Sequence, residues 1–217
     1  MAYRLGLKRA LLIRETVNTE VVYIESNRLP VSIRIAKQQL NFWVKLQTYL
    51  HNNSDHPLKS LIDQGLSSNL EQTYETPKNL EDILTNDFHT SNKAKIMRKS
   101  NDDQESRLGV YLQVNPSLTP PTQRSHLLEF ERVLLTRYRC GSHNLQIEVG
   151  RMCNPKILRE NRLCKCNGGV QSLHHCLFEC ALLREVHNEF DYSTIEEAFN
   201  SQEIVNLLVR IGRVLGV

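Results

Sequence analysis

The sequence predicts a mostly α-helical fold in three parts: a helical N-terminal segment (residues 1–84), a polar linker (85–121) and a helical C-terminal module (122–217). Apolar residues recur at a spacing near 3.6 in several segments, whereas strand-like alternation is confined to short runs such as 21–24 and 109–114. A polar stretch separates the two helical halves. With 217 residues, 40% of them hydrophobic, the chain can bury a core.

In the N-terminal part, Pro30 fits the first turn of a helix that continues to about residue 50, because apolar residues follow it at helical spacing. Shorter helices are expected at 58–66 and 79–84. From Thr85 to Arg107 apolar residues are few and turn-forming residues are many, so we expect a linker or a weakly packed stretch. Prolines continue this boundary, at Pro116, Pro120 and Pro121.

In the C-terminal part, helical periodicity predicts three segments: from Thr122 to about Arg139, from Cys176 to Phe190, and from about Gln202 to Leu215. Ser193 and Glu196 fit a capping box that opens a shorter helix between the last two.

The apolar runs and the cysteine content of the sequence indicate the cellular compartment in which the protein is expected. The apolar runs are far shorter than the roughly 20 residues that a membrane-spanning helix needs, and the run Ala10–Ile13 is too short for a signal peptide. We therefore expect an intracellular protein, cytoplasmic or nuclear, without membrane contact. In such a reducing compartment the six cysteines are thiols or metal ligands rather than disulfides.

The formal net charge of +3 conceals two basic segments. Residues 1–50 hold 8 basic and 3 acidic side chains, and residues 124–165 hold 9 and 4, while the segments that follow each of them are acidic. Basic segments on a nearly neutral chain suit a polyanion, although solvated helix faces are the alternative explanation.

The stretch RLCKCNGGVQSLHHCLFEC contains the pattern C-x-C-x8-H-x4-C, formed by Cys164, Cys166, His175 and Cys180. Zinc prefers four sulfur or nitrogen ligands in a tetrahedron, and two close pairs can supply them. The glycines after Cys166 allow backbone amides to approach a thiolate and allow a left-handed turn. Arg162 and Lys165 would favour the thiolate form. We therefore predict a zinc site.

Alternatives remain open at this site. The first pair is tighter than the usual C-x2-C. His174 could replace His175 as a ligand, and Cys176 with Cys180 forms a competing pair on one helical face. These residues could also be ordinary buried thiols.

Residue order adds a family resemblance. An arginine-rich helix is followed by a turn with Gly and His, a Leu, a Gly-Arg, a Pro, an Arg-x-Cys and a final His-x4-Cys. These features fall on Arg137, Arg139, Gly141, His143, Leu145, Gly150, Arg151, Pro155, Arg162, Cys164, Cys166, His175 and Cys180. The segment 134–186 thus resembles the zinc-binding region near the C-terminus of reverse transcriptases from non-LTR retrotransposons. Residues 8–46 look like the helical segment that follows the polymerase in the same proteins, while the polar middle is unmatched.

The resemblance implies a region that holds RNA or DNA without catalysis. The expected phosphate-binding residues are Arg137, Arg139, Arg151, Lys156, Arg159, Arg162 and Lys165. Tyr138 is the one aromatic candidate for base stacking in the segment, so backbone contacts should dominate. A polymerase needs paired aspartates at a strand turn. The Asp102–Asp103 pair lacks that setting, and we expect no enzyme activity.

Three other functions compete with nucleic-acid binding. A zinc-stapled helical module could bind a protein partner through acidic C-terminal helices, which carry Glu185, Glu189, Glu196, Glu197 and Glu203. Cys176 could act as a nucleophile with His174 or His187 as its base, although no orienting group or oxyanion site is evident. The chain could also be an inert remnant of a mobile element.

Overall fold

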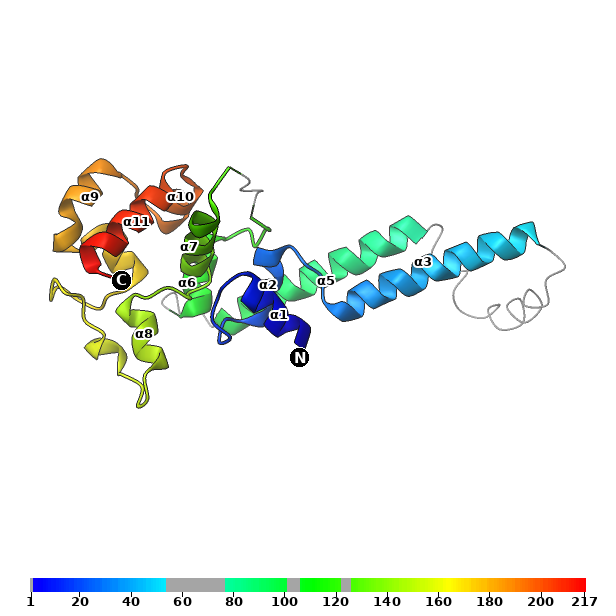
Figure 1. Cartoon of the computed structure of the whole chain (residues 1–217), viewed down its shortest axis with the longest axis horizontal. Helices are drawn as coiled ribbons and strands as arrows, with labels where there is room; N and C mark the ends of the chain where they lie inside the picture. Colours follow the sequence, from blue (N-terminus) through cyan, green and yellow to red (C-terminus); the bar gives the residue numbers. More distant parts are fainter. Residues whose placement is uncertain (1, 54–76, 101–105, 122–125) are drawn as a thin grey trace. The chain divides into compact units, whose positions relative to one another are not determined.

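The computed structural model describes residues 2–53, 77–100, 106–121 and 126–217 (Figure 1). The helices are α1 (Ala2–Ala10), α2 (Thr19–Ser26), α3 (Val31–Asn52), α5 (Pro77–Ser100), α6 (Arg107–Val114), α7 (Glu129–Arg139), α8 (Gln146–Met152), α9 (Arg184–Glu189), α10 (Ile195–Asn200) and α11 (Ile204–Leu215). Short helices of other types are η1 (Arg159–Asn161), η2 (His175–Glu179) and η3 (Ala181–Leu183). Within these ranges the only strand-like feature is an isolated antiparallel bridge between Leu163 and Val170. The mostly α prediction is confirmed.

The chain divides into two compact units that differ from the predicted parts. Unit 1 comprises Met1–Asn27 together with Ile96–Val217, and unit 2 comprises Arg28–Lys95. The predicted division at residue 84 is therefore replaced by one in which the first 27 residues belong with the C-terminal half. Among the described residues, no helix is both long and apolar enough to span a bilayer.

The stretch 85–121, predicted as a linker or a weakly packed stretch, contains helical residues over much of its length. Helix α5 occupies its first part, and α6 occupies 107–114, where Ser106 caps the helix by accepting a hydrogen bond from the Gly109 amide at 2.9 Å. A polar composition does not exclude a helix, because polar residues such as Lys and Arg have good helix propensity. Ile96, fully buried in a core of unit 1, also anchors the end of α5. The helix expected at 58–66 lies outside the described residues, and the one at 79–84 is part of α5.

Several predicted helix ends are shifted. Helix α7 begins at Glu129, where the Glu131 carboxylate accepts a hydrogen bond from the Leu128 amide at 2.7 Å; the predicted start at Thr122 lies outside the described residues. Helix α10 is capped one residue later than predicted, with Thr194 Oγ1 accepting from the Glu197 amide at 3.1 Å. The helix expected at 176–190 is divided into η2, η3 and α9.

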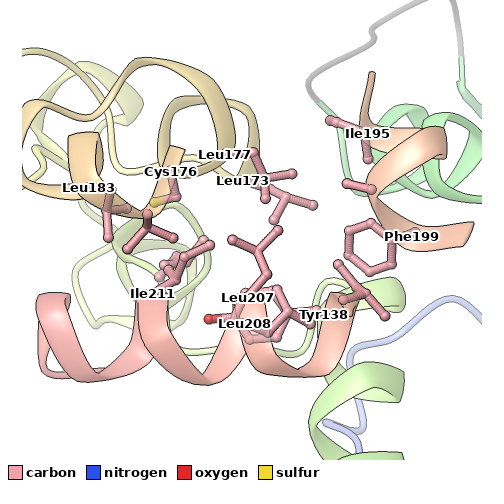
Figure 2. Close-up of a cluster of buried hydrophobic side chains, with 14 of the residues drawn as sticks. Tyr138, Leu173, Cys176, Leu177, Leu183, Ile195, Phe199, Leu207, Leu208 and Ile211 are labelled. Carbon is pink, nitrogen blue, oxygen red and sulfur yellow. The ribbon is translucent and has the colours of Figure 1, made fainter. Parts of the chain in front are cut away.

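The main core of unit 1 is built around α11. Its apolar stripe, Leu207, Leu208 and Ile211, packs with side chains from the segment around η2 and from α7 and α10 (Figure 2). A second core gathers the N-terminal segment, α2 and α6 around Ile96 and Tyr111. The metal-ligand candidates lie at the edge of the main core, which includes Cys164 and Cys180.

Candidate metal centre

The four predicted ligands converge. One potential ligand atom from each of Cys164, Cys166, His175 and Cys180 lies within 4.8 Å of all the others. The Sγ atoms of Cys164 and Cys180 are 3.6 Å apart, and Cys166 Sγ lies 3.2 Å from His175 Nε2. Cys164, His175 and Cys180 are buried, and Cys166 is partly exposed. The cluster could hold a metal ion.

A tight turn presents the first two sulfurs. The Cys164 amide donates to the Gly169 carbonyl at 2.8 Å, and the Asn167 amide donates back to the Cys164 carbonyl at 2.9 Å. Asn167 adopts the left-handed conformation with φ +58°, the turn conformation that the sequence suggested for a glycine. The Gly168 amide approaches Cys166 Sγ at 3.3 Å, and a Cβ on Gly168 would stand 3.3 Å from that sulfur. The glycine thus permits an amide-to-sulfur hydrogen bond, as predicted.

A π-helical turn brings the second pair together. Five residues of an α-helix rotate by about 500°, which would leave His175 and Cys180 about 140° apart on its surface. Instead, η2 closes with the Cys180 amide donating to the His175 carbonyl at 2.9 Å, the i→i+5 bond of a π-helix. Ser172 Oγ accepts from the His175 amide at 3.1 Å and fixes the start of the turn. The H-x4-C spacing therefore matches the π-turn.

The structure separates the alternative ligands. The side chain of His174 is 58% exposed and lies outside the ligand cluster. Cys176 is fully buried and lies among apolar side chains of the main core, near Leu183 and Ile211 (Figure 2). His175 is therefore the histidine of the cluster, and Cys176 is a core residue.

The surroundings of Cys176 do not favour a nucleophile. Burial raises the pKa of its thiol, and the neighbouring cysteines raise the pKa further. His187 Nε2 lies 3.0 Å from the Cys176 carbonyl oxygen. A thiol held neutral in an apolar core lacks the activation that covalent catalysis requires.

The electrostatics of the cluster depend on how many thiols are ionised. Desolvation acts to raise the pKa of Cys166, but hydrogen bonds from the Gly168 amide, His175 and the other two thiols lower it to about 6. Desolvation and the neighbouring thiols raise the pKa of Cys180 to about 12. The Cys166 thiolate is readily formed, whereas a Cys180 thiolate needs a compensating cation.

Two polar residues around the ligands were not identified from the sequence. Gln171 is fully buried, and its Nε2 lies 3.9 Å from Cys164 Sγ while its Oε1 accepts from the Gln146 amide at 2.8 Å. Glu179 Oε2 lies 3.2 Å from His175 Nδ1. The four-residue spacing of His175 and Glu179 was a readable signal on a helix, whereas nothing in the sequence marked Gln171.

Two of the basic residues predicted to contact phosphate are internal, which corrects that prediction. Arg139 is buried and forms an ion pair with Glu25. Arg162 is buried and donates to the carbonyl oxygens of Ile147 and Ile157. Both guanidinium groups donate to internal acceptors and are therefore not available to phosphate. The donors of Arg162 face carbonyl oxygens, which argues against the thiolate-stabilising role expected of this residue.

The other five basic residues retain exposure to different degrees. Lys156 and Arg159 are exposed. Arg137 is exposed and donates to the Leu12 carbonyl at 2.9 Å. Arg151 forms an ion pair with Glu148, and Lys165 Nζ donates to the Leu215 carbonyl.

Tyr138, the predicted stacking residue, is buried and stacks on His143 with ring centroids 4.9 Å apart. Its ring is therefore closed to bases. The acidic C-terminal surface is also reduced, since Glu189 pairs with Arg210 and Glu197 accepts hydrogen bonds from Ser193. Asp102 and Asp103 lie outside the described residues.

Neither a protein-family model, nor a curated protein, nor a solved structure matches this chain. The case for a function therefore rests on the chemistry of the four converging ligands and of the side chains around them.

Proposed function

We propose that this chain is a zinc-stabilised, non-catalytic module that binds RNA or DNA through the phosphate backbone, similar to the C-terminal region of non-LTR retrotransposon reverse transcriptases. The observation that carries the proposal is the convergence of three sulfurs and one imidazole nitrogen within 4.8 Å. The N-terminal and C-terminal resemblances described above supply the nucleic-acid part of the proposal.

Zinc is the metal that this donor set fits best. Structural zinc sites are tetrahedral and use Cys and His in sets such as Cys3His, and thiolates select against magnesium and calcium. The burial of three of the four ligands leaves no obvious open coordination position, as expected for a structural ion. Binding free energies of structural zinc reach about 10–16 kcal/mol, which would stabilise a segment with few large apolar side chains.

The basic residues that keep their exposure support phosphate contacts. Lys156 and Arg159 precede the first ligand turn, and Arg137 lies on α7. Arg139, Arg162 and Tyr138 are buried. The expected binding is therefore electrostatic and weakly selective for nucleotide sequence. Its dissociation constant should be on the order of 10⁻⁴–10⁻⁶ M at physiological salt.

The metal is tested by measuring zinc per chain in protein purified under reducing conditions. A ratio near one supports the proposal. A chain that holds no zinc even after zinc has been added would refute the metal site.

Nucleic-acid binding is tested by fluorescence anisotropy with single-stranded RNA and duplex DNA over a range of salt concentrations. Lys156→Glu and Arg159→Glu should each weaken binding and lower the slope of log affinity against log salt by about 1. Arg184→Glu is the matched control, because it changes the same charge on an exposed residue of the acidic C-terminal segment. Binding that is undetectable at low salt, or that responds equally to all three variants, would exclude the proposed surface.

A further inference from the structure

The carboxylate of Glu179 lies between the imidazole rings of two consecutive histidines. Its Oε2 is 3.2 Å from His175 Nδ1, and its Oε1 is 3.2 Å from His174 Nδ1. We infer that Glu179 is a positioning residue of the metal centre, whose carboxylate holds the His175 ring with a proton on Nδ1 and with Nε2 directed at the three sulfurs. This inference rests on the metal binding proposed above.

The two ring nitrogens of His175 face different partners. Nε2 lies 3.2 Å from Cys166 Sγ, within the ligand cluster, whereas Nδ1 faces the Glu179 carboxylate. A neutral imidazole carries a proton on one nitrogen only, and an ionised carboxylate can only accept. The proton therefore belongs on Nδ1, which leaves the lone pair of Nε2 for a cation. Histidine ligands of zinc commonly have such an outer carboxylate partner.

The ligand turn and Ser172 form the other surroundings of His175. The ligand turn passes near the ring, since a Cβ on Gly168 would stand 3.8 Å from His175 Cε1 and a Cβ on Gly169 would stand 3.7 Å from Nδ1. The His175 amide is held by Ser172 Oγ at 3.1 Å. The backbone of His175 is thus fixed, and Glu179 supplies the directional contact to the ring at Nδ1.

The exposure of Glu179 indicates which property it should affect. Its side chain is 56% exposed, whereas that of His175 is 4% exposed. Exposed ion pairs add little to fold stability because water screens them. The effect of Glu179 should therefore be seen in metal affinity and in the tautomer of His175, and much less in the fold of the metal-bound chain.

The experiment compares four variants of the full chain: Glu179→Ala, Glu179→Gln, His174→Ala and Glu185→Ala. Zinc affinity is measured by competition with a chromophoric chelator, and cobalt absorption reports the coordination geometry. We expect Glu179→Ala to weaken zinc binding by about 10–100-fold. Glu179→Gln should recover part of the loss, because its amide oxygen still accepts from Nδ1. His174→Ala should have a smaller effect, and Glu185→Ala, an exposed glutamate outside the cluster, should have none.

A second readout is long-range ¹H–¹⁵N NMR of the zinc-bound chain, which should show the His175 proton on Nδ1. Equal zinc affinity of Glu179→Ala and the unmodified chain, or a proton on Nε2, would overturn the inference while leaving the metal site in place. If the unmodified chain binds neither zinc nor cobalt, the proposed function fails together with the inference. Circular dichroism of each metal-loaded variant confirms that the compared chains are folded.

Discussion

Arg139 and Glu25 form a buried ion pair across 114 positions of sequence, with Nη2 2.8 Å from Oε1 and Nε 3.0 Å from Oε2. Tyr111 Oη donates to the same carboxylate at 2.9 Å. The pair ties α2 to α7 and accounts in part for the membership of the N-terminal residues in unit 1.

The first prediction concerns this pair. Glu25→Gln and Arg139→Met should each lower the free energy of unfolding of unit 1 by about 3–5 kcal/mol, because each change leaves a buried polar or charged partner uncompensated. The double variant Glu25→Gln/Arg139→Met should lose less than the sum of the single changes. Urea denaturation of all four proteins gives these values, and strict additivity would show that the two side chains act independently.

The second prediction concerns metal removal. Cys164→Ser and Cys180→Ser should abolish stoichiometric zinc binding and unfold the segment around η1, η2 and η3, because the metal free energy supports a local core. Helix α3 belongs to unit 2 and should remain protected. Hydrogen exchange read by mass spectrometry tests both statements.

Cys153→Ser is the matched control for this experiment, since its thiol lies outside the cluster and contacts the Val149 carbonyl at 3.5 Å. Hydrogen exchange near residue 165 that is the same in all three serine variants would contradict a structural role for the ion.

The third prediction concerns Lys165, which follows the first ligand. Its Nζ donates to the Leu215 carbonyl at the end of α11, where a cation also complements the helix dipole. Lys165→Met should destabilise unit 1 by roughly 0.5–1 kcal/mol without reducing zinc stoichiometry. Thermal unfolding of the zinc-bound protein measures the loss. A melting temperature equal to that of the unmodified protein would mean that water replaces the ammonium group without cost.

The fourth prediction concerns pH. Burial, together with nearby arginines, lowers the pKa of His143 from 6.5 to about 3. Between those values the unfolded chain binds a proton that the folded chain does not, so stability falls as the pH falls from about 6.5 to about 3. The slope due to this residue should approach 1.4 kcal/mol per pH unit.

His143→Asn tests that assignment, because an Asn side chain can still accept from the Leu145 amide as His143 Nδ1 does at 3.3 Å. The variant should show a shallower decline of stability from pH 6.5 to pH 4 in urea titrations. Parallel curves would show that the acid sensitivity arises elsewhere.

Much of the candidate site could be read from local sequence. The spacing of Cys164, Cys166, His175 and Cys180 and the glycines after Cys166 indicated a possible metal cluster, because close ligand pairs and tight turns are local features. The choice of His175 over His174, and of Cys180 over Cys176, could not be read. It depended on a π-turn, whose i→i+5 bond no residue type marks in the sequence.

The sequence by itself determined that this protein is helical and that three cysteines and a histidine meet, since helical periodicity and short-range spacing are set by neighbouring residues. Only the tertiary structure decided which arginines are buried. The sequence does not distinguish an arginine that faces solvent from one that faces a buried acceptor. Arg139 pairs with the distant Glu25, and Arg162 donates to the carbonyl oxygen of Ile147. The tertiary structure also groups the first 27 residues with residues 96–217, because contacts between segments far apart in the sequence depend on which apolar surfaces fit together.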